Sequence, residues 1–404
     1  MMLKLKNTQR SPKSRYQVWG TGWLILITSI TLAFFFFLPG IIDQHMNNVY
    51  TPRSEQLDQA TKKLHEQLVI ADLHADTLLW NRDPSRRGQY GHVDLPRMLE
   101  ANMGMQVFSA VTKTPRGLNF EQNEGTTDNI TPLVIAQRWP LRTWNNLTER
   151  ALYQAQRLQR LATNSQGRFV VLQSKSDLAR FKERKDSGSK ITSGLLAIEG
   201  MHALEGISES LDRLHQAGFR MMGLTHFFDN AVGGSAHGVT KGGLTKFGRN
   251  MVAEMERLRI VIDLAHASPQ LITDVLKIAK RPVVVSHTGV KGTCPRTRNL
   301  SDSQLQLIAK NGGLVGISFF EEATCGNDVT SIVHAIQYTA DLIGIKHVAL
   351  GSDFDGAVTT PFDITGLPSL TGALMNYGFS SADIKAIMGG NVIDLLTNAL
   401  PEKP

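Results

Sequence analysis

The chain has 404 residues, of which 42% are apolar and 20% charged, an ordinary composition for a globular protein of one large domain or two small ones. The net charge of +7 comes mainly from five basic residues among the first 17, and removing those five from 43 leaves 38 basic residues against 36 acidic ones. The rest of the chain is nearly neutral, so no basic face for a nucleic acid is implied.

The first 42 residues differ in composition from the rest of the chain. Residues 1–17 are basic and contain no acidic residue, and residues 18–42 are mostly apolar and carry no charge. An uncharged run of this length exceeds the ~20 residues that cross a bilayer as a helix. Basic residues before such a span favour a cytoplasmic N-terminus. The sequence therefore predicts a cytoplasmic tail and one transmembrane anchor, with all later residues in the periplasm or outside the cell.

A cleaved signal peptide is the alternative for residues 18–42. The apolar part of a signal peptide is usually ~7–15 residues long and ends at a small-residue cleavage site. Here the apolar run is longer and ends in FFFFLPGIID, without an Ala-x-Ala pattern. We therefore favour an uncleaved anchor, followed by a linker, or a helix leading away from the membrane, over residues 43–66 and one domain over residues 67–404.

Eight short apolar runs in that domain are predicted to be strands. Their apolarity is continuous rather than alternating, which is typical of strands buried on both faces of a parallel sheet. The runs are 68–73, 105–111, 194–198, 219–225, 260–264, 282–286, 313–318 and 347–351. Amphipathic stretches at 208–218, 268–280 and 301–313 predict helices between them, and the polar residues 112–132 predict a surface loop. The pattern indicates an α/β fold, a (β/α)8 TIM-type barrel.

Residues of the kind that bind metals stand at the ends of four of these strands. They are His74, Asp76, Glu199, His266 and His287. The carboxyl ends of barrel strands meet on one face, so these side chains are expected to lie together. Imidazole and carboxylate are the ligands that zinc takes in hydrolytic sites. A buried carboxylate such as Glu199 is unfavourable unless a cation meets it, and it could bridge two metals ~3.5–4 Å apart.

Two further Asp residues follow the last predicted strand, and either could face the site. Asp353 and Asp355 both follow the last strand in GSDFDG. Either carboxylate could accept a proton from an attacking water or hold a substrate ammonium, and we favour Asp353. By contrast, the second His-x-Asp pair, His92 and Asp94, is interpreted as structural, because Asp94 stands where it would cap a helix.

Cys294 and Cys325 are the only cysteines. Outside the cytoplasm two cysteines can pair, and neither stands in a CxxC or zinc-finger spacing. Two free buried thiols are the alternative, because the sequence does not give the Cα separation that a disulfide needs.

Taken in order, the motifs ADLHAD, AIEGMHAL, LTHFFDNAVGGSAHG, IDLAHAS, VVVSHTGVKG, RNLSD and GSDFDG resemble those of the membrane dipeptidase family, within the amidohydrolase superfamily. The resemblance runs from about residue 67 to 395. It implies two zinc ions bridged by Glu199. His74 and Asp76 would complete the first zinc site, and His266 and His287 the second.

The resemblance also implies roles for further residues. His226 would contact the substrate near the scissile carbonyl, and Arg298 would bind its terminal carboxylate. Asp353 would be the acid/base residue, and Cys294 would pair with Cys325. The implied activity is hydrolysis of dipeptides by a metal-activated hydroxide, and the implied assembly is a homodimer. Another amidohydrolase activity, as an amidase or a lactonase, would keep the metal ligands without needing Arg298. A binding protein without catalysis would be expected to lack a ligand, and none is missing.

The chain departs from the family in three places. Mammalian members carry a C-terminal lipid anchor, whereas this chain is predicted to be anchored at its N-terminus. Residues 115–130 and the residues after His226 are idiosyncratic, and both could shape the pocket. Substrate preference and dimer geometry are therefore not transferred from the family.

Overall fold

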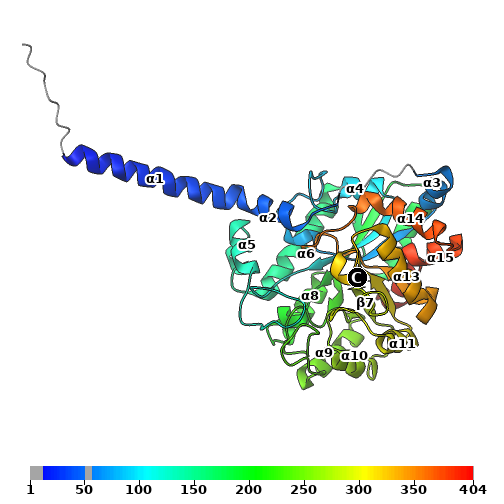
Figure 1. The fold of residues 1–404 in the computed structure, drawn as a ribbon. Coiled ribbons are helices and arrows are strands. Elements are labelled where there is room, and N and C mark those ends of the chain that lie inside the picture. Colours follow the sequence, from blue (N-terminus) through cyan, green and yellow to red (C-terminus); the bar gives the residue numbers. More distant parts are fainter. Residues whose placement is uncertain (1–11, 51–56, 404) are drawn as a thin grey trace, which may run out of the picture.

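The computed structural model describes residues 12–50 and 57–403 (Figure 1). Most of the predicted cytoplasmic tail lies outside these ranges. The strands are β1 (Ile70–Ala75), β2 (Met103–Ala110), β3 (Phe169–Val171), β4 (Thr192–Ile198), β5 (Phe219–Gly223), β6 (Val261–Asp263), β7 (Val284–Thr288), β8 (Leu314–Ile317) and β9 (Val348–Leu350).

The α-helices are α1 (Pro12–Phe36), α2 (Leu38–Met46), α3 (Gln59–Glu66), α4 (Leu95–Glu100), α5 (Ile130–Ala136), α6 (Leu147–Asn164), α7 (Lys175–Asp186), α8 (Glu209–Gln216), α9 (Lys246–Arg257), α10 (Pro269–Leu276), α11 (Asp302–Lys310), α12 (Glu321–Thr324), α13 (Val329–Ile343), α14 (Leu367–Asn376), α15 (Ser381–Lys385) and α16 (Asn391–Ala399). The short helical turns are η1 (Thr77–Leu79), η2 (Leu141–Thr143), η3 (Met201–Leu204), η4 (Ile345–His347), η5 (Ile364–Gly366) and η6 (Ala386–Gly390).

Eight of the strands close into a parallel barrel. Neighbours run in the order β2, β1, β9, β8, β7, β6, β5, β4, and pairing of β2 with β4 closes the circle. Every pairing is parallel, as the continuous apolar runs predict. The prediction of a (β/α)8-type barrel built from these eight strands is confirmed.

Strand β3 is an addition that the sequence analysis missed. It pairs with Thr192–Gly194 at the start of β4, while β5 pairs with Leu196–Ile198 further along. Because β2 occupies the other edge of β4, β3 must lie in line with β5 on the same edge. It is only three residues long, and two of the three are only partly buried, so it gives no strong apolar signal.

Alternate strand residues point to two different cores. One set, including Ile198, Ile262 and Ile317, packs against the surrounding helices. The other set fills the barrel interior and packs against Leu396 and its neighbours on α16. It includes Leu73, Leu195 and residues on the remaining strands. The barrel is therefore packed solid at the α16 end, which leaves the opposite end, where the strands finish, for a site.

Helix ends agree with the local signals in the sequence. The Ser268 side chain accepts a hydrogen bond from the Leu271 amide at the start of α10, and Ser301 and Gln304 form a reciprocal capping box at α11. Asp94 caps α4 through the Arg97 amide, as predicted. The predicted loop 112–132 extends only to residue 129, because α5 begins at Ile130.

Helix α1 projects away from the barrel, and α2 joins it to the body (Figure 1). Within the described residues no single helix is both long and apolar enough to span a membrane. The pair Thr21–Phe36 and Leu38–Met46 meets that requirement only when taken together across a bend of 41°. Three side chains on α1, Trp23, Ile27 and Ile30, are 60%, 58% and 60% exposed.

Within the predicted linker, residues 43–66, the described residues 43–50 and 57–66 contact the catalytic domain. Asp43 and Asn47 are buried, at 1% and 2% exposure, and the backbone of Tyr50 donates a hydrogen bond to Thr360. Helix α3 packs against α14. The side chains of Asp43 and Asn47 bind Arg82 and the Ala357 amide, which composition alone does not reveal.

Cys294 and Cys325 form a disulfide between the loop after β7 and the end of α12, with Cα atoms 5.3 Å apart. They are 31 residues apart in the chain. Replacing both by serine should therefore lower the free energy of unfolding by about 3–4 kcal/mol, because the bond restricts the unfolded chain. Urea unfolding of the double variant measures this. Wild-type protein unfolded in reductant should show the same midpoint as the variant, and equal midpoints for oxidised wild type and variant would contradict the expectation.

Candidate active site

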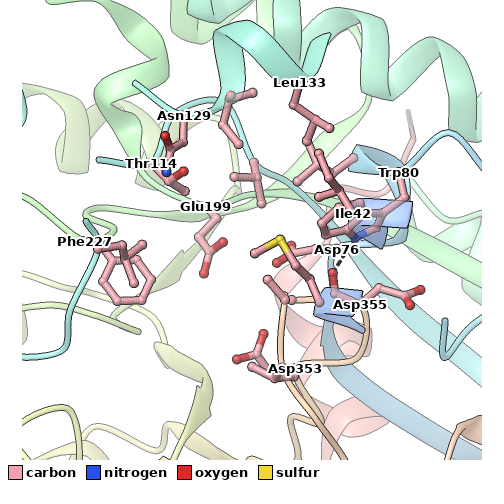
Figure 2. Close-up of a pocket in the computed structure, with 18 of the residues that line it drawn as sticks. Ile42, Asp76, Trp80, Thr114, Asn129, Leu133, Glu199, Phe227, Asp353 and Asp355 are labelled. Carbon is pink, nitrogen blue, oxygen red and sulfur yellow. Dashed lines mark hydrogen bonds between the residues drawn. The ribbon is translucent and has the colours of Figure 1, made fainter. Parts of the chain in front are cut away.

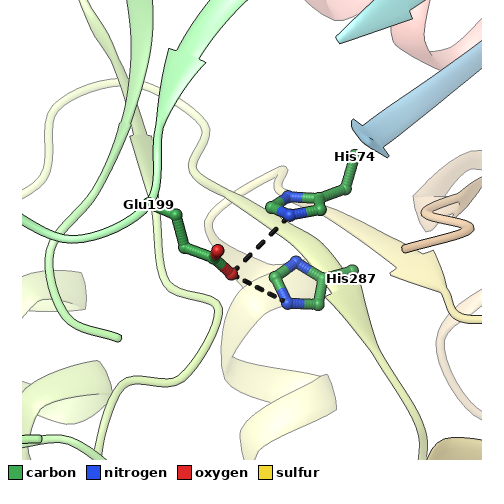
Figure 3. Close-up of side chains that lie close together, drawn as sticks. All are labelled: His74, Glu199 and His287. Atoms are coloured by element: carbon green, nitrogen blue, oxygen red, sulfur yellow. Dashed lines mark ion pairs between the residues drawn. The ribbon is translucent and has the colours of Figure 1, made fainter. Parts of the chain in front are cut away.

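The predicted metal-type residues meet at the open end of the barrel. His74 is on β1, and Asp76 directly follows that strand. Glu199 follows β4, His266 lies in the loop after β6, and His287 is on β7. All five side chains are at most 6% exposed. Figure 3 shows the side chains of His74, Glu199 and His287 converging from three different strands.

Glu199 lies at the centre of this cluster. Its Oε1 is 3.0 Å from His266 Nε2, 3.4 Å from His287 Nε2 and 3.6 Å from His74 Nε2. On the other side, His74 Nε2 is 3.4 Å from Asp76 Oδ1. One oxygen of Glu199 therefore lies within 3.6 Å of three imidazoles, which places this carboxylate at the centre of the cluster.

The charges of the site favour a cation. Burial alone would lower the pKa of His74, but Asp76, Glu199 and Asp353 outweigh it and raise that pKa to about 10. Burial lowers the pKa of His266 and His287 well below the ordinary value, so both rings are held neutral, the form that binds a metal. The cluster thus combines neutral imidazoles with carboxylates that attract positive charge.

Buried polar atoms without hydrogen-bond partners give a second test of whether the site suits a metal ion. His74 Nε2, Asp76 Oδ1 and Glu199 Oε2 are buried and have no hydrogen-bond partner among the described residues. His266 Nε2 and His287 Nε2 lie 2.9 Å apart, so that without a metal one ring would donate a hydrogen bond to the other. Buried polar atoms are rarely left unpaired, and a divalent metal with nitrogen and oxygen ligands would satisfy them. The residues present fit the implied metal.

Geometry groups the ligands differently from the predicted sets. Among residues 12–50 and 57–403, three groups have ligand atoms within 4.8 Å of one another: His74, Glu199 and His287; Glu199, His226 and His266; and His74, Asp76 and Asp353. Glu199 is shared by the first two, in agreement with its central place. The predicted partition into two zinc sites stays a prediction.

Asp353 and Asp355, left as alternatives by the sequence, have different surroundings. Asp353 Oδ1 is 3.8 Å from His74 Nε2, and burial and the nearby Glu199 raise its pKa to about 6 despite His74 and Arg298. Asp355 is completely buried. Its carboxylate is bound by the Thr77 hydroxyl at 2.7 Å and by Arg82 Nη2 at 2.7 Å. Asp353 thus lies beside the metal-type residue His74, whereas the Asp355 carboxylate is held by Thr77 and Arg82.

His92 belongs to the same structural unit as Asp355. The backbone amide of His92 donates to Asp355 Oδ1 at 2.7 Å, and the Asp355 amide lies 2.8 Å from His92 Nδ1. The ring is fully buried and stacks on Phe354. This contact agrees with the structural interpretation of the His92–Asp94 pair.

A cavity of about 760 Å³ opens over the cluster. Figure 2 shows Glu199 and Asp353 facing it from two sides, with Asp76 and Asp355 close to Trp80. Leu118 and Phe120, from the idiosyncratic loop, and Phe227, which directly follows His226, are also among its lining residues. The cavity has the size of a small-molecule site, in which few polar groups orient a ligand among apolar walls.

Two predicted substrate contacts line this cavity. His226 Nε2 lies 3.3 Å from Glu199 Oε2, and burial lowers the pKa of His226 well below its usual value. Arg298 is 7% exposed and stacks over the ring of Phe320, 4.9 Å from its centre. Its Nε and Nη1 atoms find no hydrogen-bond acceptor in the described parts of the chain. A buried guanidinium with free donors is suited to a carboxylate ligand.

The model of the membrane dipeptidase family, peptidase family M19, matches residues 58–400. The chain belongs to this family. It is 31% identical to the dipeptidase aclJ of Aspergillus oryzae over 353 residues, which cover 82% of this chain and 78% of that protein. It is 30% identical to the dipeptidase tcpJ of Claviceps purpurea, over 76% of this chain and 69% of that protein.

Solved structures agree with the assignment. A metallopeptidase from Rhodobacter sphaeroides, solved with a phosphinate mimic of the dipeptide L-Ala-D-Ala, matches with a TM-score of 0.66 at 26% identity, over 82% of this chain and 99% of that one. The probable dipeptidase PvdM from Pseudomonas aeruginosa matches in fold with a TM-score of 0.71 at 18% identity, over 84% of this chain and 98% of that one. This M19 member is therefore a metallo-dipeptidase, a hydrolase that acts on peptide bonds.

Two buried carboxylates of this M19 site were missed by the sequence analysis. Asp72 accepts hydrogen bonds from the Ser352 amide and the Gln106 side chain, each at 2.7 Å. Asp263 accepts from the Ser286 amide at 2.9 Å, and the Ser286 hydroxyl is 3.0 Å from His287 Nδ1. Both therefore fix the strand ends that present ligands, as residues behind metal ligands commonly do. The sequence signal that could have identified them is an Asp shortly before a metal-type His: Asp72 in DLH and Asp263 in DLAH.

Backbone conformation marks the same site. His266 and Asp353 adopt left-handed φ angles of 60° and 64°. Such angles are uncommon for residues other than glycine and are often retained at functional positions. Gly200 has φ of 96°, and a Cβ there would lie 2.5 Å from His202 Nδ1, so only glycine can follow Glu199 in this turn.

Proposed function

We propose that this chain is a zinc-dependent dipeptidase with two zinc ions bridged by Glu199. The observation that carries the proposal is one cavity whose floor is a cluster of imidazoles and carboxylates. Its wall holds the guanidinium of Arg298, whose Nε and Nη1 have no acceptor among the described residues. The first feature suits a metal and the second suits the free carboxylate of a short peptide.

His74 and Asp76 would hold one zinc with Glu199, and His266 and His287 would hold the other. Metals bound there would supply an activated water and polarise the peptide carbonyl. The chain's own residues then position and move protons. Arg298 fixes the terminal carboxylate, which limits productive substrates to short peptides.

His226 and Asp353 act on the reacting atoms in this proposal. Because burial keeps His226 neutral, its ring can donate one N–H to the oxygen on which negative charge develops. Asp353 accepts a proton from the attacking water and returns it to the leaving amine. Its raised pKa, near 6, suits a group that both takes and gives a proton near neutrality.

The proposal is tested on the full-length chain in detergent micelles, with metal content measured on the same sample. Hydrolysis of L,L or L,D dipeptides with close to two zinc ions per chain, lost on chelation and restored by zinc, is expected. The Rhodobacter metallopeptidase, solved with an L-Ala-D-Ala mimic, is the reason to include L,D substrates. Bound zinc with hydrolysis of a lactone or another amide, and of no dipeptide, would instead support a different amidohydrolase activity.

Replacing Arg298 by glutamate distinguishes the two activities. The variant should lose about 10–100-fold in kcat/KM for a dipeptide, because a charged hydrogen bond to the substrate carboxylate is lost. A dipeptide amide, which lacks that carboxylate, should be affected far less. Steady-state kinetics with Ala-Ala and Ala-Ala-amide measure the difference. An equal loss for both would mean that Arg298 supports the site without recognising the carboxylate.

Localisation and assembly also belong to the proposal. The predicted anchor, residues 18–42, would enter the bilayer through the part of α1 before Phe34, since Phe34, Leu38 and Ile42 line the cavity and so lie outside the lipid, with the barrel in the periplasm or outside the cell. Exposed apolar side chains along α1 and a disulfide between Cys294 and Cys325 support this placement. Protease protection in sealed vesicles tests the topology. The homodimer implied by the resemblance is tested by light scattering on the solubilised protein.

A further inference from the structure

The N-terminal helices supply one wall of the active-site cavity. Phe34 at the end of α1, Leu38, Ile42 and Met46 on α2, and Tyr50 beyond it all line the cavity that also contains Glu199. These five side chains recur every four residues. Residues four apart lie on one face of a helix, so the helical members form a single apolar stripe that faces the site.

A second stripe on α2 fastens the helix to the barrel. Asp43 Oδ2 accepts from Arg82 Nε at 2.7 Å, and Arg82 Nη2 lies 2.7 Å from Asp355 Oδ1. Asn47 donates to Asp43 at 2.8 Å and accepts from the Ala357 amide at 3.0 Å. The loop after β9, which carries Asp353, is thus bound directly to α2. The apolar stripe is held in a fixed position against the site.

This wall lies outside the region matched by the family. The M19 family model covers residues 58–400, whereas the wall comes from residues 34–50. The wall therefore comes from outside the matched catalytic barrel, and its residues contribute to the cavity of this chain.

The wall completes an apolar compartment beside the metal-type residues. Ile42 packs against a cluster that includes Leu79, Trp80, Val111 and Leu133. Figure 2 shows Ile42 next to Asp76 and Trp80, with Leu133 above them and Phe227 across the cavity. A dipeptide with two small side chains would leave the apolar walls of this compartment in contact with water. A large apolar side chain would remove that surface from water, at roughly 25 cal/mol per Å².

The compartment also lies at one particular end of the substrate. Asp76, Trp80 and Ala357, which border it, belong to the loops after β1 and β9, while Arg298 belongs to the loop after β7. With the terminal carboxylate on Arg298, an amino-terminal residue that extends away from the loop after β7 would meet Asp76 and Trp80, in the loop after β1.

We propose that α2 is a specificity-determining wall, and that this enzyme prefers dipeptides whose amino-terminal residue carries a large apolar side chain. The inference rests on the dipeptidase function proposed above. It names the substrate class of that site and assigns Ile42 and Met46 as residues that contact the amino-terminal side chain.

The test compares Phe-Ala, Ala-Phe and Gly-Ala as substrates of the zinc-loaded, full-length protein in detergent micelles. Wild type should favour Phe-Ala over Gly-Ala by at least tenfold in kcat/KM, because apolar contacts in a pocket discriminate by roughly 10–200-fold. Ile42→Asn should lower the ratio of Phe-Ala to Gly-Ala about tenfold. The matched control is Ile41→Asn, since the neighbouring Ile41 is 61% exposed and is not among the cavity-lining residues.

Met46→Asn provides an independent second variant. Met46 is 42% exposed at the end of α2, so its replacement places no polar group in a packed core. It should lower the same ratio in the same direction. A ratio that is unchanged in both variants, or that changes equally in Ile41→Asn, would overturn the inference. A selective loss of Ala-Phe hydrolysis would overturn the assignment to the amino-terminal residue. If wild type binds zinc and hydrolyses none of the three dipeptides, the proposed function fails and this inference fails with it.

Discussion

Replacing Glu199 by glutamine should remove most of the bound metal and lower kcat by roughly a thousandfold or more, the scale on which loss of the main electrostatic stabiliser acts. Glu199 touches three imidazoles through Oε1, from His74, His266 and His287. Glutamine keeps the size of the side chain but has no charge and only one acceptor oxygen. One substitution therefore weakens both halves of the proposed metal pair at once.

Metal analysis and dipeptide hydrolysis on the same preparation measure the effect of Glu199→Gln. Glu321→Gln is the matched control, because Glu321 lines the same cavity but is exposed and lies in none of the candidate metal groups. It should retain wild-type zinc content. A Glu199→Gln protein with full zinc content and near-normal turnover would show that this carboxylate neither bridges metals nor supports the reaction.

The sequence was sufficient to predict the barrel because each strand is short and continuously apolar, and several end in a polar residue of distinctive type. His74, Glu199 and His287 stand at or just beyond strand ends, and the carboxyl ends of parallel strands necessarily meet. Convergence of the ligands results from topology alone. Their partition between metals does not, because it depends on distances of a few tenths of an ångström between side chains.

Other features depended on contacts that local patterns do not encode. Asp43 and Asn47 are ordinary polar residues in a segment predicted to be a linker, and their burial arises from Arg82 and Ala357, far along the chain. The same applies to Asp72, whose partner Ser352 is 280 residues away. A buried polar residue is recognised only when its partner is known, whereas a strand is recognised from its own composition.

Asp353 and Asp355 provide the sharpest contrast between a residue for chemistry and one for structure. The same change, aspartate to asparagine, removes one charge at two positions that are two residues apart in the sequence. Asp353 faces the cavity beside His74, whereas Asp355 is enclosed by Arg82, Thr77 and His92. Although burial disfavours the charged form of Asp355, these partners together hold its pKa below the ordinary value.

Asp353→Asn should therefore lower kcat by roughly 10²–10⁴-fold, the usual contribution of a general acid or base, while zinc content and thermal stability change little. Asp355→Asn should show the reverse, with a lower melting temperature and a smaller loss of kcat, since Arg82 would keep only Asp43 as a charged partner. Turnover, zinc content and melting temperature measured on both variants separate the two effects. Full turnover by Asp353→Asn would refute its acid/base role, and loss of zinc from that variant would make Asp353 a metal ligand instead, as its grouping with His74 and Asp76 allows.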